Sequence, residues 1–359
     1  MYNHFKDSQE AESESVCSYA YFFGVFKSMN ISFAQPTNDL CKRCAEHNHV
    51  HSQPDHSCSA CDCSACFGFL KHKTDAQEAR SALNDDTKRM EEDSRIIVSA
   101  VDMQKAITIP KVPTKDHFFS RKLVVFNETF ASPGKNGNTI CVLWHEAEAG
   151  RLAYNIYSSY IEFIKQNRDK EEIILYADNC TSQNKNWTLF PFMPRIINDP
   201  SVGAKSITIK YCEPGNTFMA ADAVHGNIAT KMNRQTAIYD FTDVVNLIES
   251  SRKNIRCAVV DHNSMYMFEN RAKKVNLALR DLKVVQFRRG SLSMYIKESH
   301  EKNCSFREIK LLKQAEIREV QSIFSREENP VTCVPRMQKP RGVSEVKFEK
   351  QTVIMILFC

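Results

Sequence analysis

Two aspartates each close an apolar run of this 359-residue chain. Asp102 ends RIIVSAVD (95–102), and Asp178 ends EEIILYAD (171–178). Such runs predict buried strands, and open α/β sheets carry functional side chains at the carboxyl ends of their strands. Two carboxylates held together there repel each other, so they must share a proton or a cation. Mg²⁺ and Mn²⁺ suit oxygen ligands, and two such ions can activate the attacking oxygen and stabilise the leaving oxygen of a phosphodiester.

A third carboxylate is needed to hold two ions, and Asp222 stands in the helical pattern FMAADAVHGNIATKMNR (218–234). We predict Asp102, Asp178 and Asp222 as a catalytic triad that binds two Mg²⁺ or Mn²⁺ ions. His225 lies on the same helical face as Asp222, and Glu146 ends the third predicted strand, so both are predicted as accessory residues. Ordinary alternatives remain open: helix caps for the aspartates, a packed histidine, and a solvated sheet edge for Glu146.

A polar block, DNCTSQNKN (178–186), begins at Asp178. Asn179, Gln183, Asn184 and Lys185 are expected where the strand leads into a helix N-terminus, whose free N–H groups favour phosphate. The lysine adds a positive charge, and the amides can bind the nucleic-acid backbone or base edges. We predict these four residues as nucleic-acid-binding, and the alternative is a solvated turn.

Six cysteines near the N-terminus form three C-x2-C pairs, a spacing that lets two thiolates reach one tetrahedral ion. The pairs are Cys41/Cys44, Cys58/Cys61 and Cys63/Cys66, and His72 follows them. We predict a structural Zn²⁺ site from these residues, with Cys41 and Cys44 as the preferred pair. The remaining ligands and the presence of a second ion stay open.

The elements that would position these residues follow the order β-β-β-α-β-α-β-α. Strands are predicted at 95–102, 122–130, 138–148, 171–178 and 206–213, and the clearest helices at 151–168 and 218–234. This order predicts an α/β fold, a ribonuclease H-like mixed sheet with flanking helices, plus a small N-terminal zinc-binding unit. The expected divisions are a zinc-binding unit with a linker helix (1–94), a catalytic core (95–250), a mixed C-terminal extension of the core (251–335) and a tail (336–359).

Composition limits the class of protein. Forty-two percent hydrophobic and 25% charged residues, with 10 glycines and 12 prolines, are typical of a globular protein and exclude fibrous or low-complexity classes. The net charge of +5 is compatible with a polyanionic partner. The polar N-terminus predicts no secretory signal, and no apolar run reaches the roughly 18 residues that would span a membrane. An intracellular chain is therefore expected, whose clustered cysteines favour metal ligation over disulfides.

The block DNCTSQNKN resembles the D-N-C-x-G-Q-N-K-N block of a family of animal transposable-element-derived proteins related in fold to DDE/D transposases. Five further segments resemble that family: VDMQKAITIP (101–110), WHEAEAGR (144–151), PGNTFMAADAVHGNI (214–228), NISFAQPTNDLCKRC (30–44) and HKTDA (72–76). The similarity covers about residues 17 to 300. Ser182 replaces the family's usual glycine, and Asn216 replaces a usual histidine.

The resemblance implies a metal-dependent nuclease and strand-transfer fold with Asp102, Asp178 and Asp222 as its triad. We therefore expect a nuclear, transposase-like protein that cleaves and transfers DNA strands, in an active or a decayed copy, and that can assemble as a homo-oligomer. Two alternatives remain: a catalytically inert DNA-binding or interaction protein that keeps the fold, and a ribonuclease H-like exonuclease unrelated to transposition.

Overall fold

The structure of the protein is a computed structural model that describes residues 2, 5, 6, 9, 15–29, 41–51, 63–113, 121–134, 137–215, 217, 219–267, 273, 275–325, 336–344 and 347. Its strands are β1 (Ile96–Met103), β2 (Ile107–Ile109), β3 (Leu123–Ala131), β4 (Thr139–His145), β5 (Glu172–Ala177), β6 (Ser206–Tyr211), β7 (Ile255–Val259), β8 (Val284–Arg288), β9 (Ser293–Lys297) and β10 (Arg307–Lys310). Its helices are α2 (Tyr19–Ser28), α3 (Lys42–Val50), α4 (Ser64–Glu92), α6 (Ala153–Gln166), α7 (Leu189–Ile197), α8 (Ala220–Arg234), α9 (Phe241–Glu249) and α10 (Gln314–Ser325), with 3₁₀ turns η2 (His262–Ser264) and η3 (Leu279–Asp281). The predicted mixed α/β class is therefore confirmed.

The described strands form one ten-stranded sheet in the order β10-β9-β8-β6-β5-β1-β3-β4-β7, with β2 paired to β3. β1, β3 and β4 form the predicted antiparallel meander, while β5 runs parallel to β1 and β6 runs parallel to β5. Val101 of β1 lies opposite Ala177 of β5, so Asp102 and Asp178 follow at the same level of two adjacent strands. This register is what brings two distant acidic residues to one edge of the sheet.

The segment after residue 250 extends the same sheet at both edges. β7 adds in parallel to β4, and β8, β9 and β10 continue in antiparallel fashion from β6. The sheet that carries the two aspartates therefore also includes the C-terminal strands.

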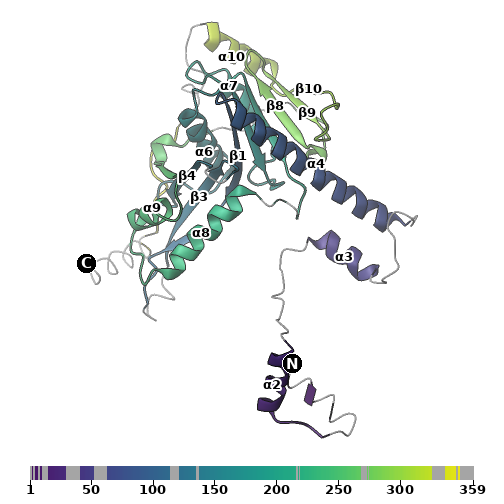
Figure 1. Cartoon of the computed structure of the whole chain (residues 1–359). Coiled ribbons are helices and arrows are strands. Elements are labelled where there is room, and N and C mark those ends of the chain that lie inside the picture. Colours follow the sequence, from purple (N-terminus) through teal and green to yellow (C-terminus); the bar gives the residue numbers. More distant parts are fainter. Residues whose placement is uncertain are drawn as a thin grey trace.

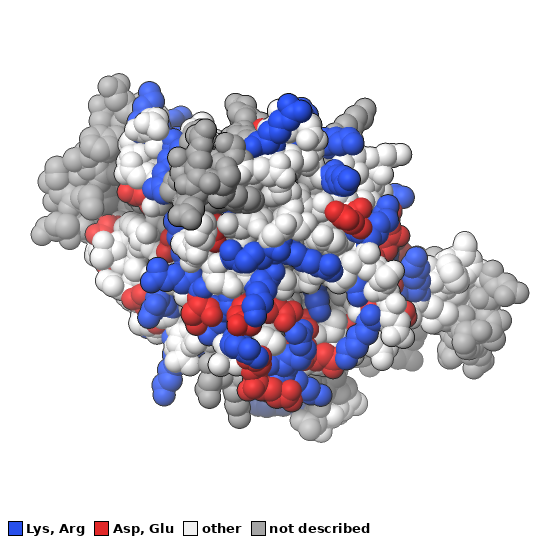
Figure 2. All heavy atoms as spheres, turned by 90° about the horizontal axis from the view of Figure 1, so that it is seen from above, with Lys and Arg blue, Asp and Glu red and all other residues white. Residues whose placement is uncertain are grey.

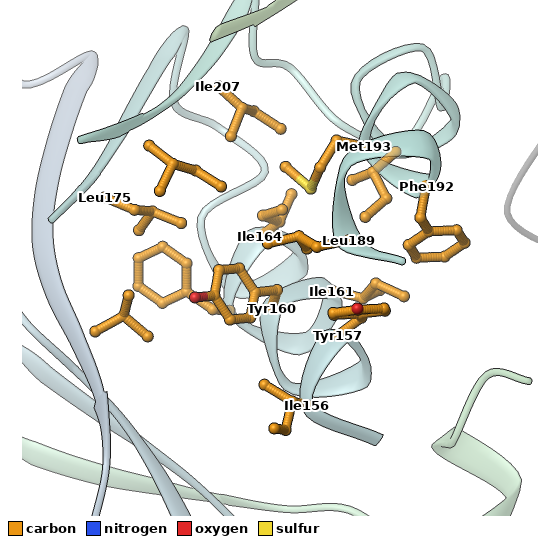
Figure 3. Close-up of a cluster of buried hydrophobic side chains, with 14 of the residues drawn as sticks. Ile156, Tyr157, Tyr160, Ile161, Ile164, Leu175, Leu189, Phe192, Met193 and Ile207 are labelled. Atoms are coloured by element: carbon orange, nitrogen blue, oxygen red, sulfur yellow. The ribbon is translucent and has the colours of Figure 1, made fainter. Parts of the chain in front are cut away.

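Helices cover both faces of the sheet (Figure 1). α6 and α7 bury their apolar side chains on one face, as Figure 3 shows for a cluster that includes Ile156, Tyr157, Tyr160, Ile161, Ile164, Leu175, Leu189, Phe192, Met193 and Ile207. α4, α8 and α9 pack on the opposite face through a second cluster that includes Leu83, Val224 and Val244. Both faces of the central strands are buried, which explains why these strands are apolar along their whole length.

The predicted linker helix is longer than its sequence pattern indicates. α4 begins directly after Cys63, whose side chain caps its first turn, and continues without interruption for 29 residues to the start of β1. His72, Ala76, Ala79 and Asp86 are buried along this helix. α4 therefore connects the cysteine-rich segment rigidly to the sheet. Among the described residues, every helix is either too short or too polar to cross a membrane.

Candidate functional site

Asp102, Asp178 and Asp222 line one cavity of about 490 Å³ at the carboxyl ends of β1 and β5. Asp102 comes from β1, Asp178 from the residue after β5, and Asp222 from the first turn of α8. The cavity is also lined by Asn179, Cys180, Pro214, Gly215, Thr217 and Met219. The structure thus brings the three predicted carboxylates to one place, while their catalytic role stays a prediction.

Two of the three carboxylates are held by local hydrogen bonds. Asp178 Oδ1 accepts from the backbone N–H of Cys180 at 3.0 Å and from Asn184 Nδ2 at 2.7 Å. Asp222 Oδ2 accepts from the backbone N–H of Met219 at 2.8 Å, which caps α8. In the described part of the chain, the other oxygen of each carboxylate accepts no hydrogen bond. Each residue therefore combines a structural contact with an oxygen that remains available to a ligand.

Asp102 is largely buried and lies close to the charges of the other two aspartates. Burial, followed by the charges of Asp178 and Asp222, raises the pKa of Asp102 to about 7. The oxygens of the three carboxylates do not all lie within 4.8 Å of one another. Among the described residues, the groups of potential ligands that meet this distance consist of cysteines and histidines. A cation in this cavity would have to draw the carboxylates closer together.

His225 lies beside Asp102, as the shared helical face predicts. Its Nδ1 is 3.6 Å from Asp102 Oδ2, and its Nε2 is 3.0 Å from the hydroxyl of Thr129. Burial lowers the pKa of His225 to about 4, so the ring is neutral near pH 7. A neutral imidazole beside Asp102 leaves uncancelled the negative charge that a metal ion requires.

Glu128 belongs to the same acidic group, although no pattern in the sequence identifies it. It lies on β3 opposite Met103, and its side chain has no exposed surface. Neither of its carboxylate oxygens has a hydrogen-bond partner among the described residues. Burial raises the pKa of Glu128 well above its usual range, and Asp102 and Asp178 raise it further. Its position inside an apolar strand, between Asn127 and Thr129, hides it from any reading of strand ends.

The burial of Gln183, Asn184 and Lys185 disfavours their expected nucleic-acid contacts, which stay predictions. Their exposed fractions are 8%, 0% and 1%, so they offer little surface to a phosphate or a base. They lie in turns before α7 rather than at its N-terminus, since α7 begins only at Leu189. Of the four predicted residues, Asn179 alone lines the carboxylate cavity.

The buried polar block positions Asp178 instead. Asn184 donates to Asp178 and accepts from the hydroxyl of Tyr160 at 2.8 Å. Lys185 Nζ donates to Asn179 Oδ1 at 2.6 Å and to the backbone carbonyl of Leu282 at 2.7 Å. Burial, followed by the nearby Lys283, lowers the pKa of Lys185 to about 8. Lys185 is thus a tether between the Asp178 loop and the chain before β8.

Glu146, predicted as an accessory residue, forms its contacts away from the three aspartates. It accepts from the backbone N–H of Val124 at 2.6 Å and pairs with Lys347. His145 of β4 lies opposite Val125 of β3, and Glu146 is the next residue after His145. Asp102 lies opposite Thr129, which is four to five residues further along β3 than the position of Glu146. At about 3.4 Å per residue this separates Glu146 from Asp102 by roughly 15 Å along the strands.

A Cys/His cluster adjoins the carboxylate cavity. Cys41 Sγ lies 3.2 Å from His72 Nε2, and Cys44 completes a group of three ligands within 4.8 Å. Tetrahedral Zn²⁺ with bonds of about 2.3 Å to sulfur and 2.0 Å to nitrogen separates such ligands by roughly 3.6 Å. The cluster can therefore hold a metal ion such as Zn²⁺. Of the other predicted zinc ligands, Cys58 and Cys61 lie outside the described residues, and Cys63 and Cys66 lie in a separate group.

This cluster supports the wall of the cavity. His72 Nδ1 lies 2.9 Å from Glu213 Oε1, and a carboxylate in that position fixes the ring of a metal-binding histidine. Gly215 has φ +76°, and a Cβ there would lie 2.1 Å from the Cβ of Cys41. Only glycine permits this approach. Residues 213–215 therefore contact the cluster directly, and Pro214 and Gly215 also line the cavity.

No family model, no curated protein and no solved structure matches this chain.

Replacing Lys185 by Met should lower the free energy of unfolding by on the order of 2–3 kcal/mol, because Asn179 Oδ1 and the Leu282 carbonyl would lose their buried donor. Urea denaturation measures this change. Lys205→Met is the matched control, because its side chain is 71% exposed, and it should change stability by less than about 0.5 kcal/mol. Equal effects of the two variants would contradict the tether.

Loss of the cluster ligand Cys44 should loosen the cavity wall. In Cys44→Ser we expect amide exchange at 213–222 to accelerate about tenfold or more, because the Cys41 and His72 contacts to Gly215 and Glu213 are no longer fixed by an ion. Hydrogen–deuterium exchange measures it, with Cys304→Ser, which lies outside both Cys/His groups, as control. Unchanged exchange in a variant shown to have lost metal would contradict the coupling.

The raised pKa of Asp102 makes stability depend on pH. The folded protein keeps a proton that the unfolded chain releases near the ordinary aspartate pKa of 3.8, so the free energy of unfolding falls as pH rises towards about 7. Without added Mg²⁺ or Mn²⁺, the stability gain of Asp102→Asn over wild type should therefore grow between about pH 5.5 and 7.5, by on the order of 2 kcal/mol. Denaturation at each pH tests this, and a gain that is constant across the range would refute it. Asp169→Asn, 69% exposed, serves as control.

Proposed function

We propose that the protein is a transposase-like nuclease that cleaves DNA through Asp102, Asp178 and Asp222 in a ribonuclease H-like core. One observation carries the proposal: carboxylates from β1, β5 and α8 line one cavity at the carboxyl edge of the sheet. The burial of Asp102 among like charges, with its pKa raised to about 7, supports a site that takes up a cation.

The sheet supports the proposed fold. In the order β4-β3-β1-β5-β6, β3 alone runs opposite to the other four strands, and the two aspartates lie at the carboxyl ends of adjacent parallel strands. This is the meander followed by parallel additions that the sequence order predicts. The resemblance of the DNCTSQNKN block to transposable-element-derived proteins supports the same assignment.

When bound, two Mg²⁺ or Mn²⁺ ions would activate the attacking oxygen and stabilise the leaving oxygen. The residues of the chain then hold and orient the reaction. Water adds to the phosphorus as the P–O3′ bond breaks, leaving a 3′-hydroxyl and a 5′-phosphate, and the 3′-hydroxyl can attack a second phosphodiester in strand transfer. Asp178 and Asp222 offer their unbonded oxygens, and the neutral His225 lies beside Asp102.

Basic residues at the same edge of the sheet favour DNA as the partner. Arg121, Lys122, Arg341 and Lys347 line a cavity of about 650 Å³ beside the start of β3, with Glu146 as its acidic residue. On the face seen from above in Figure 2, Lys and Arg side chains are interspersed with Asp and Glu. A backbone phosphate fits the first arrangement better. We further propose structural Zn²⁺ in the cysteine-rich segment, a nuclear location and assembly with further copies of the chain.

An inert DNA-binding protein is the second candidate function. The observation that favours it is that Asp178 and Asp222 each form local caps and that the three carboxylates do not close within 4.8 Å. In that case the acidic cavity would bind no divalent cation.

Replacing Asp178 by Asn should abolish calorimetric Mn²⁺ binding in the zinc-loaded protein and reduce nicking of supercoiled DNA at least about 100-fold, because it removes a charged oxygen ligand. Asp169→Asn, a surface carboxylate, should match wild type in both assays.

Mn²⁺ binding and nicking that both survive in Asp178→Asn would refute the assigned site. A wild-type protein that binds DNA, takes up no Mn²⁺ and cuts nothing would establish the inert candidate. Release of single nucleotides without strand joining would instead indicate the exonuclease.

A further inference from the structure

Four potential ligands converge away from the carboxylate cavity, where the end of α3 meets the start of α4. His47 and His51 project from α3, and Cys63 and Cys66 form the N-terminal C-x2-C pair of α4. His51 Nε2 lies 3.4 Å from Cys63 Sγ and 3.5 Å from Cys66 Sγ. His47 Nε2 lies 3.5 Å from Cys66 Sγ.

The three sulfur–nitrogen distances match a tetrahedral site, because sulfur and nitrogen ligands around Zn²⁺ are separated by roughly 3.6 Å. His47, His51 and Cys66 lie within 4.8 Å of one another, and Cys63 joins this group through its contact with His51. His47 and His51 are four residues apart on one helical face, which lets both rings reach one ion. Cys66 is fully buried and His47 is 8% exposed, with its ring stacked on Phe69 at 3.9 Å. The two residues are therefore fixed in position by packing.

α3 and α4 each supply potential metal ligands at both ends of their contact. In the cluster beside the cavity, α3 supplies the C-x2-C pair, Cys41 and Cys44, and α4 supplies His72. At the other end, α4 supplies the C-x2-C pair and α3 supplies the histidines. Each C-x2-C begins its helix, and Cys41 and Cys63 each cap it by accepting from the backbone N–H three residues on. A thiol at a helix N-terminus is favoured as the thiolate that a metal binds.

α3 has few buried side chains that would hold it against α4. It has nine residues, and only Cys44 and His47 among its described side chains are buried. An isolated helix of this length is marginal in water, and two buried side chains form no core that would hold it against α4. Coordination at both ends of the contact would supply the missing stabilisation.

We propose that His47, His51, Cys63 and Cys66 form a second, structural Zn²⁺ site, so that the chain binds two zinc ions between α3 and α4. Four protein ligands close the coordination sphere, which leaves no position for water or substrate. The proposal does not depend on the nuclease assignment, because none of the four residues lines the carboxylate cavity.

Zinc content and Co²⁺ substitution test the proposal. The full-length protein purified with zinc should contain two equivalents by elemental analysis, and His47→Ala should contain one. His49→Ala is the matched control, because His49 lies on the same helix with an exposed side chain, and it should keep two. His47→Cys should restore two, since Cys₃His is also a zinc ligand set.

A measurement on the wild type guards against a variant that fails to fold. Co²⁺ titration of the apoprotein should reach its endpoint at two equivalents, with thiolate charge-transfer absorption growing through both. An endpoint at one equivalent in the wild type, or two zinc ions retained by His47→Ala, would overturn the proposal.

Discussion

The sheet places several acidic side chains close together at its carboxyl edge, and the repulsion between their charges constrains the residues around them. Asp102 and Asp178 share a level because β1 and β5 pair in parallel, and α8 adds Asp222. Such charges are tolerated only where protons, donors or cations compensate them. The structure supplies donors to Asp178 and Asp222, whereas Asp102 compensates by holding its proton up to a pKa of about 7.

The surroundings of the carboxylates follow from the need to keep these donors in place. Asn184 can donate to Asp178 only if its own carbonyl is oriented, and the Tyr160 hydroxyl of α6 does this. Asn179 is held in turn by Lys185, which also binds the chain before β8. On the opposite wall, Glu213 and Gly215 contact the Cys41 and His72 cluster. The cavity therefore depends on α6, on β8 and on the cysteine-rich segment at once.

Hydrophobic periodicity and the residues at the ends of predicted strands allowed much of this arrangement to be predicted from the sequence. The apolar runs ending at Asp102 and Asp178 predict neighbouring strands, and the C-x2-C pair at Cys41 predicts a metal cluster. The sequence pattern was less informative for side chains whose partners lie far away along the chain. Lys185 looks like a surface cation because its partners, the carbonyls of Leu282 and Arg280, lie about a hundred residues away. His47 and His51 look like a solvated histidine run until α4 places Cys63 and Cys66 beside them.

Glu128 bears on the choice between an active and an inert protein. Among the described residues the buried carboxyl of Glu128 has no hydrogen-bond partner, which costs on the order of several kcal/mol, so an apolar residue at position 128 would give a more stable protein. Met103 and Val142, its neighbours across β1 and β4, show that the surroundings suit an apolar side chain. Asp102 carries a similar cost on the adjacent strand. Two carboxyls that lower stability on adjacent strands are typical of functional sites, where local stability is given up for chemistry. This combination favours the proposed cation site, because a bound cation would stabilise the charged forms of these carboxyls, which burial and mutual repulsion disfavour.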